Sequence, residues 1–326
     1  MIQVPLEPAS TGTGDYLGQW LAHVRGRVRA KTYEGYEGLV RLYAVPGIGD
    51  VELTQLRPLH LQSLYASLLT ERDPPLSSGT VLNLHLVLTQ ALGQAVRWEL
   101  LASNPAAGAQ PPRPRRQEFT VIDAPLVARI LQAVAGSDLE LACAIGIATG
   151  MRRGEILALQ WSDIDEDYST AHVRRTLQMT NDGLVFEQPK TRRSRRAVAL
   201  PAFLGPYLLR ERGSQARRQA ELEDAWHGQG LVVCRREGSP VNPDTFSTAW
   251  PRLLVRAGLP HVRFHDLRHA HATLMLLQGV HPKVVSERLG HASIGITLDT
   301  YSHVLPEMQA EAARAFDDLF PLATRS

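Results

Sequence analysis

The sequence predicts a mainly α-helical protein with a small antiparallel β-sheet, made of a helical N-terminal domain and an α+β second domain. Three observations support this fold class. Apolar side chains recur three and four residues apart through the first 110 residues, which is the periodicity of amphipathic helices. Three prolines interrupt the polar stretch 110–116, as expected of an extended linker. Beyond this linker, short strand-like segments lie between two helical regions.

The N-terminal domain, residues 1–110, is expected to hold four or five helices. Helical periodicity covers four segments, residues 15–24, 32–43, 58–70 and 77–98. Ser77 or Ser78 is a plausible N-cap for the last of them, because a serine hydroxyl accepts a hydrogen bond from the first turn. Breaks are expected at 46–49 and 73–75, where proline and glycine or paired prolines occur.

After the linker, 111–118, the second domain is expected to run from residue 119 to 326. Asp123 as cap and Pro125 in the first turn predict a helix start, and helices continue to about residue 159. Strands are expected at 171–177, 184–188 and 197–200, with residues 180–183 as a hairpin turn between the first two. Helices then resume from residue 201, with a short strand at 231–234 and an amphipathic helix at 306–320.

Composition excludes several classes of protein. The chain has 326 residues, 44% of them hydrophobic, and no apolar run approaches the ~20 residues that span a bilayer. Its start lacks the features of a signal peptide, so we expect a cytoplasmic, nucleoid-associated protein without a membrane partner. Cys143 and Cys234 are expected to be buried free thiols in a reducing compartment. The 12 histidines are scattered, and no metal site is expected.

Basic residues are clustered although the net charge is only +2. A single basic cluster is most often only a solvent-exposed face of a protein. Several basic clusters around one site, however, predict a surface that contacts phosphates. A further cluster occupies residues 210–218. The arginines expected to contact DNA are Arg25, Arg27, Arg29, Arg113, Arg115, Arg116, Arg192 and Arg193.

Phosphodiester chemistry is indicated near the C-terminal end. His265 and Arg268 lie three residues apart, which places them on one helical face. His291 and Tyr301 follow at short range. An arginine fork binds phosphate oxygens, histidine supplies donors, and a tyrosine hydroxyl can be the nucleophile.

Two further segments carry complementary residues. Residues 148–155 predict a glycine turn into a helix start that presents Arg152 and backbone N–H groups to an anion. Lys190 is one of only three lysines among 35 basic residues, in a chain that otherwise uses arginine. An ammonium can lose its proton near neutral pH when neighbouring charges lower its pKa, whereas a guanidinium does not. Chance placement of Lys190 is the alternative.

These motifs, in this order, resemble the tyrosine recombinase (phage integrase) family. They are residues 149–155, 189–191, 265–269, 289–291 and Tyr301. The resemblance implies a SAM-like, core-type DNA-binding domain before the linker and a recombinase catalytic domain after it. It implies a site-specific DNA recombinase that needs no cofactor or metal and works through a 3′-phosphotyrosyl intermediate. The catalytic residues it implies are Arg152, Lys190, His265, Arg268, His291 and Tyr301, with Glu155 orienting a neighbouring side chain.

The resemblance also implies partners. They are double-stranded DNA with a pair of inverted-repeat sites, a homotetramer on that DNA formed from a monomer in free solution, and accessory proteins in some systems. The helix at 306–320 is expected to dock on a neighbouring subunit, with folding back on its own domain as the alternative. The DNA target sequence, and whether the reaction is integration, excision, transposition or dimer resolution, stay open.

Each residue also has a structural alternative. Arg152 could simply pair with Glu155 at the surface, His265 could cap its own helix, and His291 could be a turn residue. For the whole chain, the alternatives are a type IB topoisomerase and a catalytically silent DNA-binding regulator.

Overall fold

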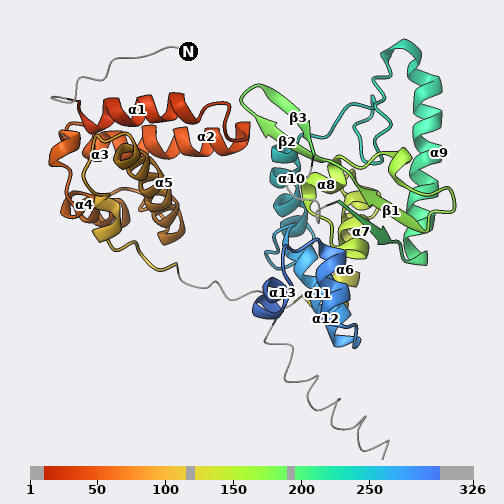
Figure 1. Ribbon diagram of the computed structural model, residues 1–326. Coiled ribbons are helices and arrows are strands. Elements are labelled where there is room, and N and C mark those ends of the chain that lie inside the picture. Colours follow the sequence, from red (N-terminus) through yellow and green to blue (C-terminus); the bar gives the residue numbers. More distant parts are fainter. Residues whose placement is uncertain (1–10, 115–121, 189–194, 302–326) are drawn as a thin grey trace, which may run out of the picture. The chain divides into compact units, whose positions relative to one another are not determined.

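The computed structural model describes residues 11–114, 122–188 and 195–301, the last three by their backbone only. The chain divides into two compact units, residues 1–118 and 119–326 (Figure 1).

The first unit is entirely helical in its described part. Its α-helices are α1 (Thr13–Val24), α2 (Ala30–Leu39), α3 (Val45–Ile48), α4 (Pro58–Thr70) and α5 (Ser78–Arg97). Short 3-10 turns occupy Leu53–Gln55 and Pro105–Gly108. The core is formed by large side chains that these helices bury, including Tyr16, Trp20, Leu61, Tyr65 and Leu88. The Ser77 hydroxyl accepts a hydrogen bond from the Thr80 N–H at 3.1 Å, so the predicted N-cap is confirmed.

The break predicted at 46–49 occurs at the end of that interval, because α3 ends at Ile48 and Gly49 is its C-cap. The chain stays helical from α2 through a π-helical turn at Val40–Ala44 and into α3. Pro46 lies in the first turn of α3. The wide π turn before it relieves the clash between a proline ring and the carbonyl four residues earlier. Pro46 therefore lies within the helical path, which ends two residues later.

The second unit is built around α7 (Glu140–Thr149), in which every residue from 142 to 149 is buried. A helix that is apolar on all sides belongs in a core, and α7 packs against four other helices. These are α6 (Ala124–Val134), α8 (Arg153–Leu157), α9 (Gly205–Leu222) and α11 (Asp266–Leu277). The remaining helices are α10 (Pro243–Arg256), α12 (Pro282–Leu289) and α13 (Ile294–Tyr301). Asp123 caps α6 as predicted, accepting a 2.9 Å hydrogen bond from the Leu126 N–H.

The described residues of the second unit form two antiparallel pairs of strands. β1 (Thr170–Val173) pairs with β4 (Arg196–Ala199), and β2 (Thr176–Thr180) pairs with β3 (Gly183–Glu187) through the predicted turn. The single strand expected at 171–177 is wrong, because it is interrupted at Arg174 and Arg175. Both guanidinium groups reach the buried Asp163 carboxylate, at 3.5 and 3.3 Å, where the chain passes from one pair to the other.

Residues 231–234 form isolated bridges instead of the predicted strand. Leu231 pairs with Gln160 and Cys234 pairs with Pro240, so the two ends of the segment face different neighbours. No helix within the described ranges is long and apolar enough to cross a membrane.

Both cysteines are free thiols. Cys143 is buried in α7, as predicted, and burial raises its pKa. Cys234 is only half-buried, which the prediction missed, and burial raises its pKa to about 11. Both thiols are therefore protonated and unreactive near neutral pH.

Candidate active site

The turn between α7 and α8 fixes the backbone of Arg152. Gly150 ends α7 in the left-handed region, at φ 64°. The Thr149 hydroxyl donates to the Ile145 carbonyl at 2.6 Å and accepts from the Met151 N–H at 3.2 Å. Arg152 then caps α8, and its side chain is 41% exposed. The predicted helix start is confirmed, and it presents a guanidinium on a rigid turn.

One backbone N–H of this helix start, that of Arg152, is already satisfied within the protein. The Glu155 carboxylate already accepts this N–H at 2.9 Å and the Arg152 guanidinium at 2.8 Å. Glu155 is only 4% exposed, so the pair is not a surface salt bridge. Burial alone would raise the pKa of Glu155, but hydrogen bonds and charge from Arg196 and Arg152 outweigh it, so the pKa lies below its usual value.

Arg268 joins three segments that are distant in sequence. It is 4% exposed in α11 and donates to the Gly150 carbonyl at 2.8 Å and to the Leu289 carbonyl at 2.7 Å. The first carbonyl lies two residues before Arg152, and the second lies two residues before His291. One buried guanidinium thus holds both of these residues next to α11.

His265 begins α11 and, within the described part of the chain, makes no side-chain capping hydrogen bond. The alternative that it serves as a helix cap is therefore not supported. Its ring stands edge-on to His269, with centroids 5.2 Å apart. Loss of hydration, followed by the positive charges of His269, Arg268 and Arg152, lowers its pKa to about 4. The imidazole is therefore uncharged at neutral pH.

His291 follows α12, which ends at Gly290 with φ 69°. Its Nδ1 lies 2.8 Å from the hydroxyl of the buried Thr297. In the tautomer where this hydroxyl donates to Nδ1, Nε2 carries the proton and can donate to a ligand. Burial lowers the pKa of His291 to about 4, with further lowering by Arg268 and Arg152. Thr297 was not predicted as part of the site, because nothing in its sequence context distinguishes it.

The comparisons with known proteins identify the family of this chain. Residues 121–308 match the phage integrase family, and residues 14–69 match the phage integrase N-terminal SAM-like domain. The chain belongs to the phage integrase family. It is therefore a tyrosine recombinase, an enzyme that cleaves and rejoins DNA strands at specific sites. The topoisomerase and silent-regulator alternatives are not favoured.

Relatives span most of the chain. A tyrosine recombinase XerC-like protein of Caldanaerobacter subterraneus is 29% identical, over 94% of this chain and 83% of its own. The ICEBs1 integrase of Bacillus subtilis is also 29% identical, over 75% of this chain and 67% of its own. The Tn1549 transposon integrase, solved with a circular intermediate DNA, superposes with a TM-score of 0.79 at 20% identity, covering 94% of this chain and all of its own. A lambda integrase tetramer bound to a Holliday junction gives a TM-score of 0.65 at 17% identity, covering 90% and 78%.

Within this recombinase, four of the six predicted catalytic residues share one site, namely Arg152, His265, Arg268 and His291. Lys190 lies outside the described residues, between β3 and β4. Tyr301 ends α13, and its side chain is likewise not described. Within the described ranges, no group of three or more His, Cys, Asp or Glu side chains is placed to hold a metal ion.

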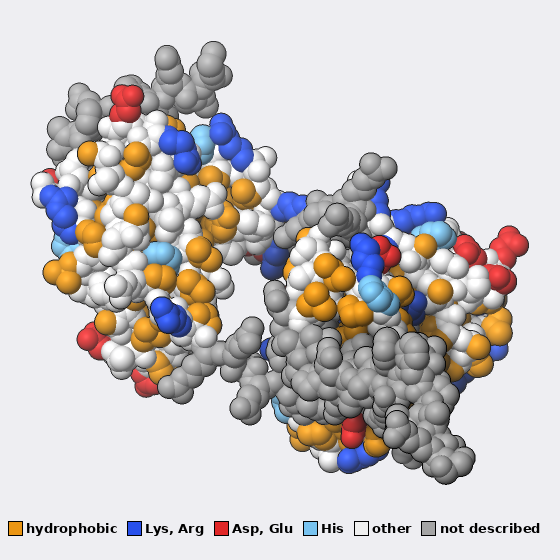
Figure 2. Space-filling view, turned by 60° about the horizontal axis from the view of Figure 1, so that its bottom comes forward, with side chains coloured by type: hydrophobic (Ala, Val, Ile, Leu, Met, Phe, Trp, Pro, Cys, Tyr) orange, Lys and Arg blue, Asp and Glu red, His pale blue; other side chains and the backbone are white. Residues whose placement is uncertain are grey.

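The predicted DNA-contacting arginines are described only in part. Arg25, Arg27 and Arg113 are exposed, and Arg29 is half-buried. Arg115, Arg116, Arg192 and Arg193 lie outside the described residues. In the view of Figure 2, Lys and Arg side chains lie at several separate places on each unit, with uncharged and hydrophobic surface between them.

Three arginines of the basic cluster at 210–218 have partners within the protein, and its prediction as a phosphate-contacting surface stays a prediction. Arg210 pairs with Glu140 at 2.7 Å, and Arg218 pairs with Glu211 at 2.6 Å. The Arg212 guanidinium lies 5.7 Å from the centre of the Trp161 ring. These side chains stabilise the packing of α9.

The sequence reasoning missed two residues, the buried His271 and the half-buried Arg288. His271 lies one turn after Arg268, and its Nδ1 is 2.8 Å from the Ile147 carbonyl. Arg288 donates to the His271 Nε2 at 3.1 Å and to the Ala148 carbonyl at 2.9 Å. They tie α12 to the end of α7. The three-residue spacing from Arg268 was the available signal, because it puts His271 on the same helical face.

His271 should make the stability of this unit sensitive to acid. Burial, with the charge of Arg288, lowers its pKa to about 4 from 6.5, so the unfolded chain takes up the proton first. The free energy of unfolding should therefore fall as the pH drops below 6.5 and level off near 4. The His271 contribution is about 2 kcal/mol between pH 7.5 and 5. Urea denaturation of wild type and His271→Gln at both pH values measures it. An unchanged pH dependence in the variant would contradict this assignment.

Gly150 should tolerate no side chain. A Cβ there would lie 2.6 Å from the Leu289 Cδ2 and 2.8 Å from the His271 Cδ2, in addition to the strain of a positive φ. We expect Gly150→Ala to destabilise the unit by about 2–4 kcal/mol. Gly136→Ala is the matched control, since Gly136 has φ 72° but nothing within 4 Å of its Cβ. The free energy of unfolding of this control, measured by chemical denaturation, should fall by about 1 kcal/mol. Equal losses of stability in the two variants would contradict the steric argument.

Proposed function

We propose that this recombinase cuts DNA by attack of the Tyr301 hydroxyl on a scissile phosphate, which forms a 3′-phosphotyrosyl link and releases a 5′-hydroxyl. That hydroxyl from one duplex then attacks the link on another, which exchanges the strands. The covalent link keeps the energy of the phosphodiester bond, so no nucleotide cofactor is implied. The observation that carries this proposal is the pair of hydrogen bonds from Arg268 to Gly150 and Leu289.

These two bonds hold the segments that carry Arg152 and His291 next to Arg268, and we propose that the three side chains bind one phosphate. An attacked phosphodiester gains negative charge in its transition state, and preorganised donors stabilise that charge. Arg152 and Arg268 supply fixed positive charge, and the His291 Nε2–H supplies a further donor. Because Glu155 holds Arg152 in place, little reorganisation is needed when the phosphate arrives.

Two proton transfers complete the reaction. The Tyr301 phenol is mostly protonated at neutral pH, so its proton must leave as the bond to phosphorus forms. We assign His265 as the acceptor, because its imidazole is uncharged and lies close enough to Arg268 and Arg152 for their charges to act on it. We assign Lys190 as the general acid that protonates the departing 5′-oxygen.

DNA contacts extend over both units. In this proposal residues 1–110 form the core-type DNA-binding domain, and residues 111–118 are a basic linker to the catalytic domain at 119–326. Arg25, Arg27, Arg29, Arg113, Arg115, Arg116, Arg192 and Arg193 contact backbone phosphates. Such contacts make binding depend strongly on salt. The enzyme would act in the cytoplasm, associated with the nucleoid.

The active assembly is proposed to be a homotetramer on a pair of inverted-repeat sites, formed from monomers in free solution and assisted in some settings by accessory proteins. The amphipathic helix expected at 306–320, which lies outside the described residues, would dock on a neighbouring subunit. Deleting residues after 305 should then leave the unfolding transition of the monomer unchanged and abolish paired DNA complexes in a native gel. A truncated monomer that unfolds would instead support folding back on its own domain.

The experiment that tests the function uses fragmented host DNA. The purified full chain is incubated with the fragments and quenched with detergent, and the DNA that stays covalently attached is sequenced. Adducts focused on a few inverted-repeat sites are expected. Adducts spread broadly would support topoisomerase-like cleavage instead, and no adducts would contradict the proposal.

A further inference from the structure

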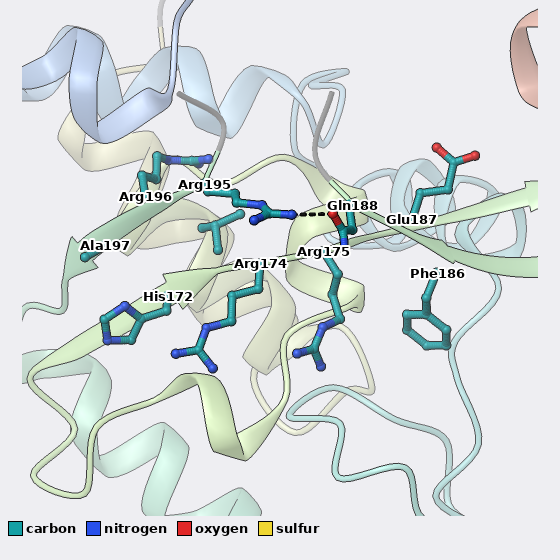
Figure 3. Close-up of a pocket in the computed structure, with 10 residues that line it drawn as sticks. His172, Arg174, Arg175, Phe186, Glu187, Gln188, Arg195, Arg196 and Ala197 are labelled. Carbon is teal, nitrogen blue, oxygen red and sulfur yellow. Dashed lines mark hydrogen bonds between the residues drawn. The ribbon is translucent and has the colours of Figure 1, made fainter. Parts of the chain in front are cut away.

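Arg196 is a buried arginine that has no place in the mechanism above. It is the first residue of β4, and its side chain is only 6% exposed. Its neighbour Arg195 is exposed and hydrogen-bonds Gln188 across the strand ends (Figure 3). Both arginines line a groove together with His172, Arg174, Arg175 and Gln188, and in Figure 3 Arg174 and Arg175 extend away from Arg196. Arg196 therefore differs from the other arginines of this groove, because its guanidinium binds a buried carboxylate, that of Glu155.

Its guanidinium binds two elements of the active site at once. It donates to both carboxylate oxygens of Glu155, at 2.8 and 3.2 Å, and its Nε donates to the Arg288 carbonyl at 2.6 Å. Glu155 is the residue that holds the Arg152 backbone and guanidinium. The Arg288 carbonyl lies three residues before His291. Both contacts therefore end next to a residue that we place around the phosphate.

The chemistry of this position requires arginine. Bidentate binding of one carboxylate and a third bond in another direction need the planar fork, which a lysine ammonium does not provide. Breaking a buried pair by removing one partner leaves a charge without compensation. Without the Arg196 guanidinium, only Arg152 would neutralise the Glu155 carboxylate. The hydrogen bonds around Arg152 would then change.

The structure assigns Arg196 as a positioning residue of this active site. It holds Glu155, and through it Arg152, against the strand that directly follows the segment carrying Lys190. Glu155 is then shared between a catalytic arginine and a structural one, which fixes its orientation better than Arg152 alone. This inference rests on the proposed function of Arg152.

The test compares Arg196→Met with Arg195→Met, a matched removal of the exposed neighbouring charge. Single-turnover adduct formation is measured at saturating DNA and at a temperature where denaturation curves show every variant to be folded. We expect Arg196→Met to slow the step at least tenfold with DNA affinity changed less than threefold. Arg195→Met should change the rate less than twofold. If Arg196→Met does not fold, Arg196→Lys replaces it, with an intermediate loss expected.

A double-mutant cycle separates positioning from a general effect on the fold. In an Arg152→Ala background, Arg196→Met should cost less than threefold, because the residue it positions is already gone. The same tenfold loss in both backgrounds would overturn the inference.

An activity-independent measurement covers the case in which the wild type forms no adduct and the proposed function itself fails. Hydrogen exchange at the Arg152 side chain, followed by ¹⁵N NMR of the full chain, should accelerate at least fivefold in Arg196→Met and stay unchanged in Arg195→Met. Equal exchange in the two variants would overturn the role of Arg196 whatever the reaction.

Discussion

Replacing Tyr301 by phenylalanine should abolish covalent protein–DNA adducts and leave DNA binding within twofold of the wild type. The substitution removes one oxygen, which is the atom proposed to form the bond to phosphorus, so no partial activity is expected. Phenylalanine keeps the apolar ring, and the arginines that contact DNA are unchanged. Detergent-stable adducts on a labelled site and a gel-shift titration of the same DNA measure both quantities.

Arg268, one of the four described residues of the site, supplies a comparison for this prediction. Arg268→Gln should also reduce adducts strongly, but it should lower stability as well, because the hydrogen bonds to Gly150 and Leu289 are buried. Tyr301→Phe should leave the unfolding transition within about 0.5 kcal/mol of the wild type. An adduct that survives in Tyr301→Phe would move the nucleophile to another side chain.

Replacing Lys190 by alanine should have the second largest effect, a decrease of about 10²- to 10⁴-fold in the rate of strand cleavage. Without a general acid, the 5′-oxygen must leave as an alkoxide. A DNA substrate whose bridging 5′-oxygen is replaced by sulfur has a leaving group that needs no proton. On that substrate we expect Lys190→Ala to cleave within about tenfold of the wild type.

Lys283 offers a matched control, since it is another lysine of the same unit and pairs with Glu287 on α12 at 3.0 Å. Lys283→Ala should change cleavage less than twofold on either substrate. If the sulfur substrate does not rescue Lys190→Ala, then Lys190 is not the general acid and a role in binding the phosphate must be considered instead.

Local features of the fold could be predicted from the sequence because their causes are local. Ser77 and Asp123 cap the helices that follow them, and residues 180–183 turn between β2 and β3. The order of the motifs also indicated which segments would contribute to the site. Arg152, His265, Arg268 and His291 come from such segments, and each lies at an end or on a face that helical spacing defines.

The remaining features depend on contacts between distant segments. At the strand break, Arg174 pairs with the distant Asp163 carboxylate, and the helical path to Pro46 includes a π turn that has no clear sequence signal. Arg196 looks like one more member of a basic run until Glu155, 41 residues away, is placed beside it. Sequence spacing cannot show which arginine of such a run is buried, because burial is decided by packing.

The measurement that tests the account most directly is the chemical identity of the covalent adduct. Wild-type protein is trapped on its DNA, digested with nuclease and protease, and analysed by mass spectrometry. We predict one modified peptide that carries a nucleotide joined through its 3′-phosphate to Tyr301. A nucleotide on any other side chain, or a link through a 5′-phosphate, would contradict the proposed arrangement of Tyr301, Arg152 and Arg268 around one scissile phosphate.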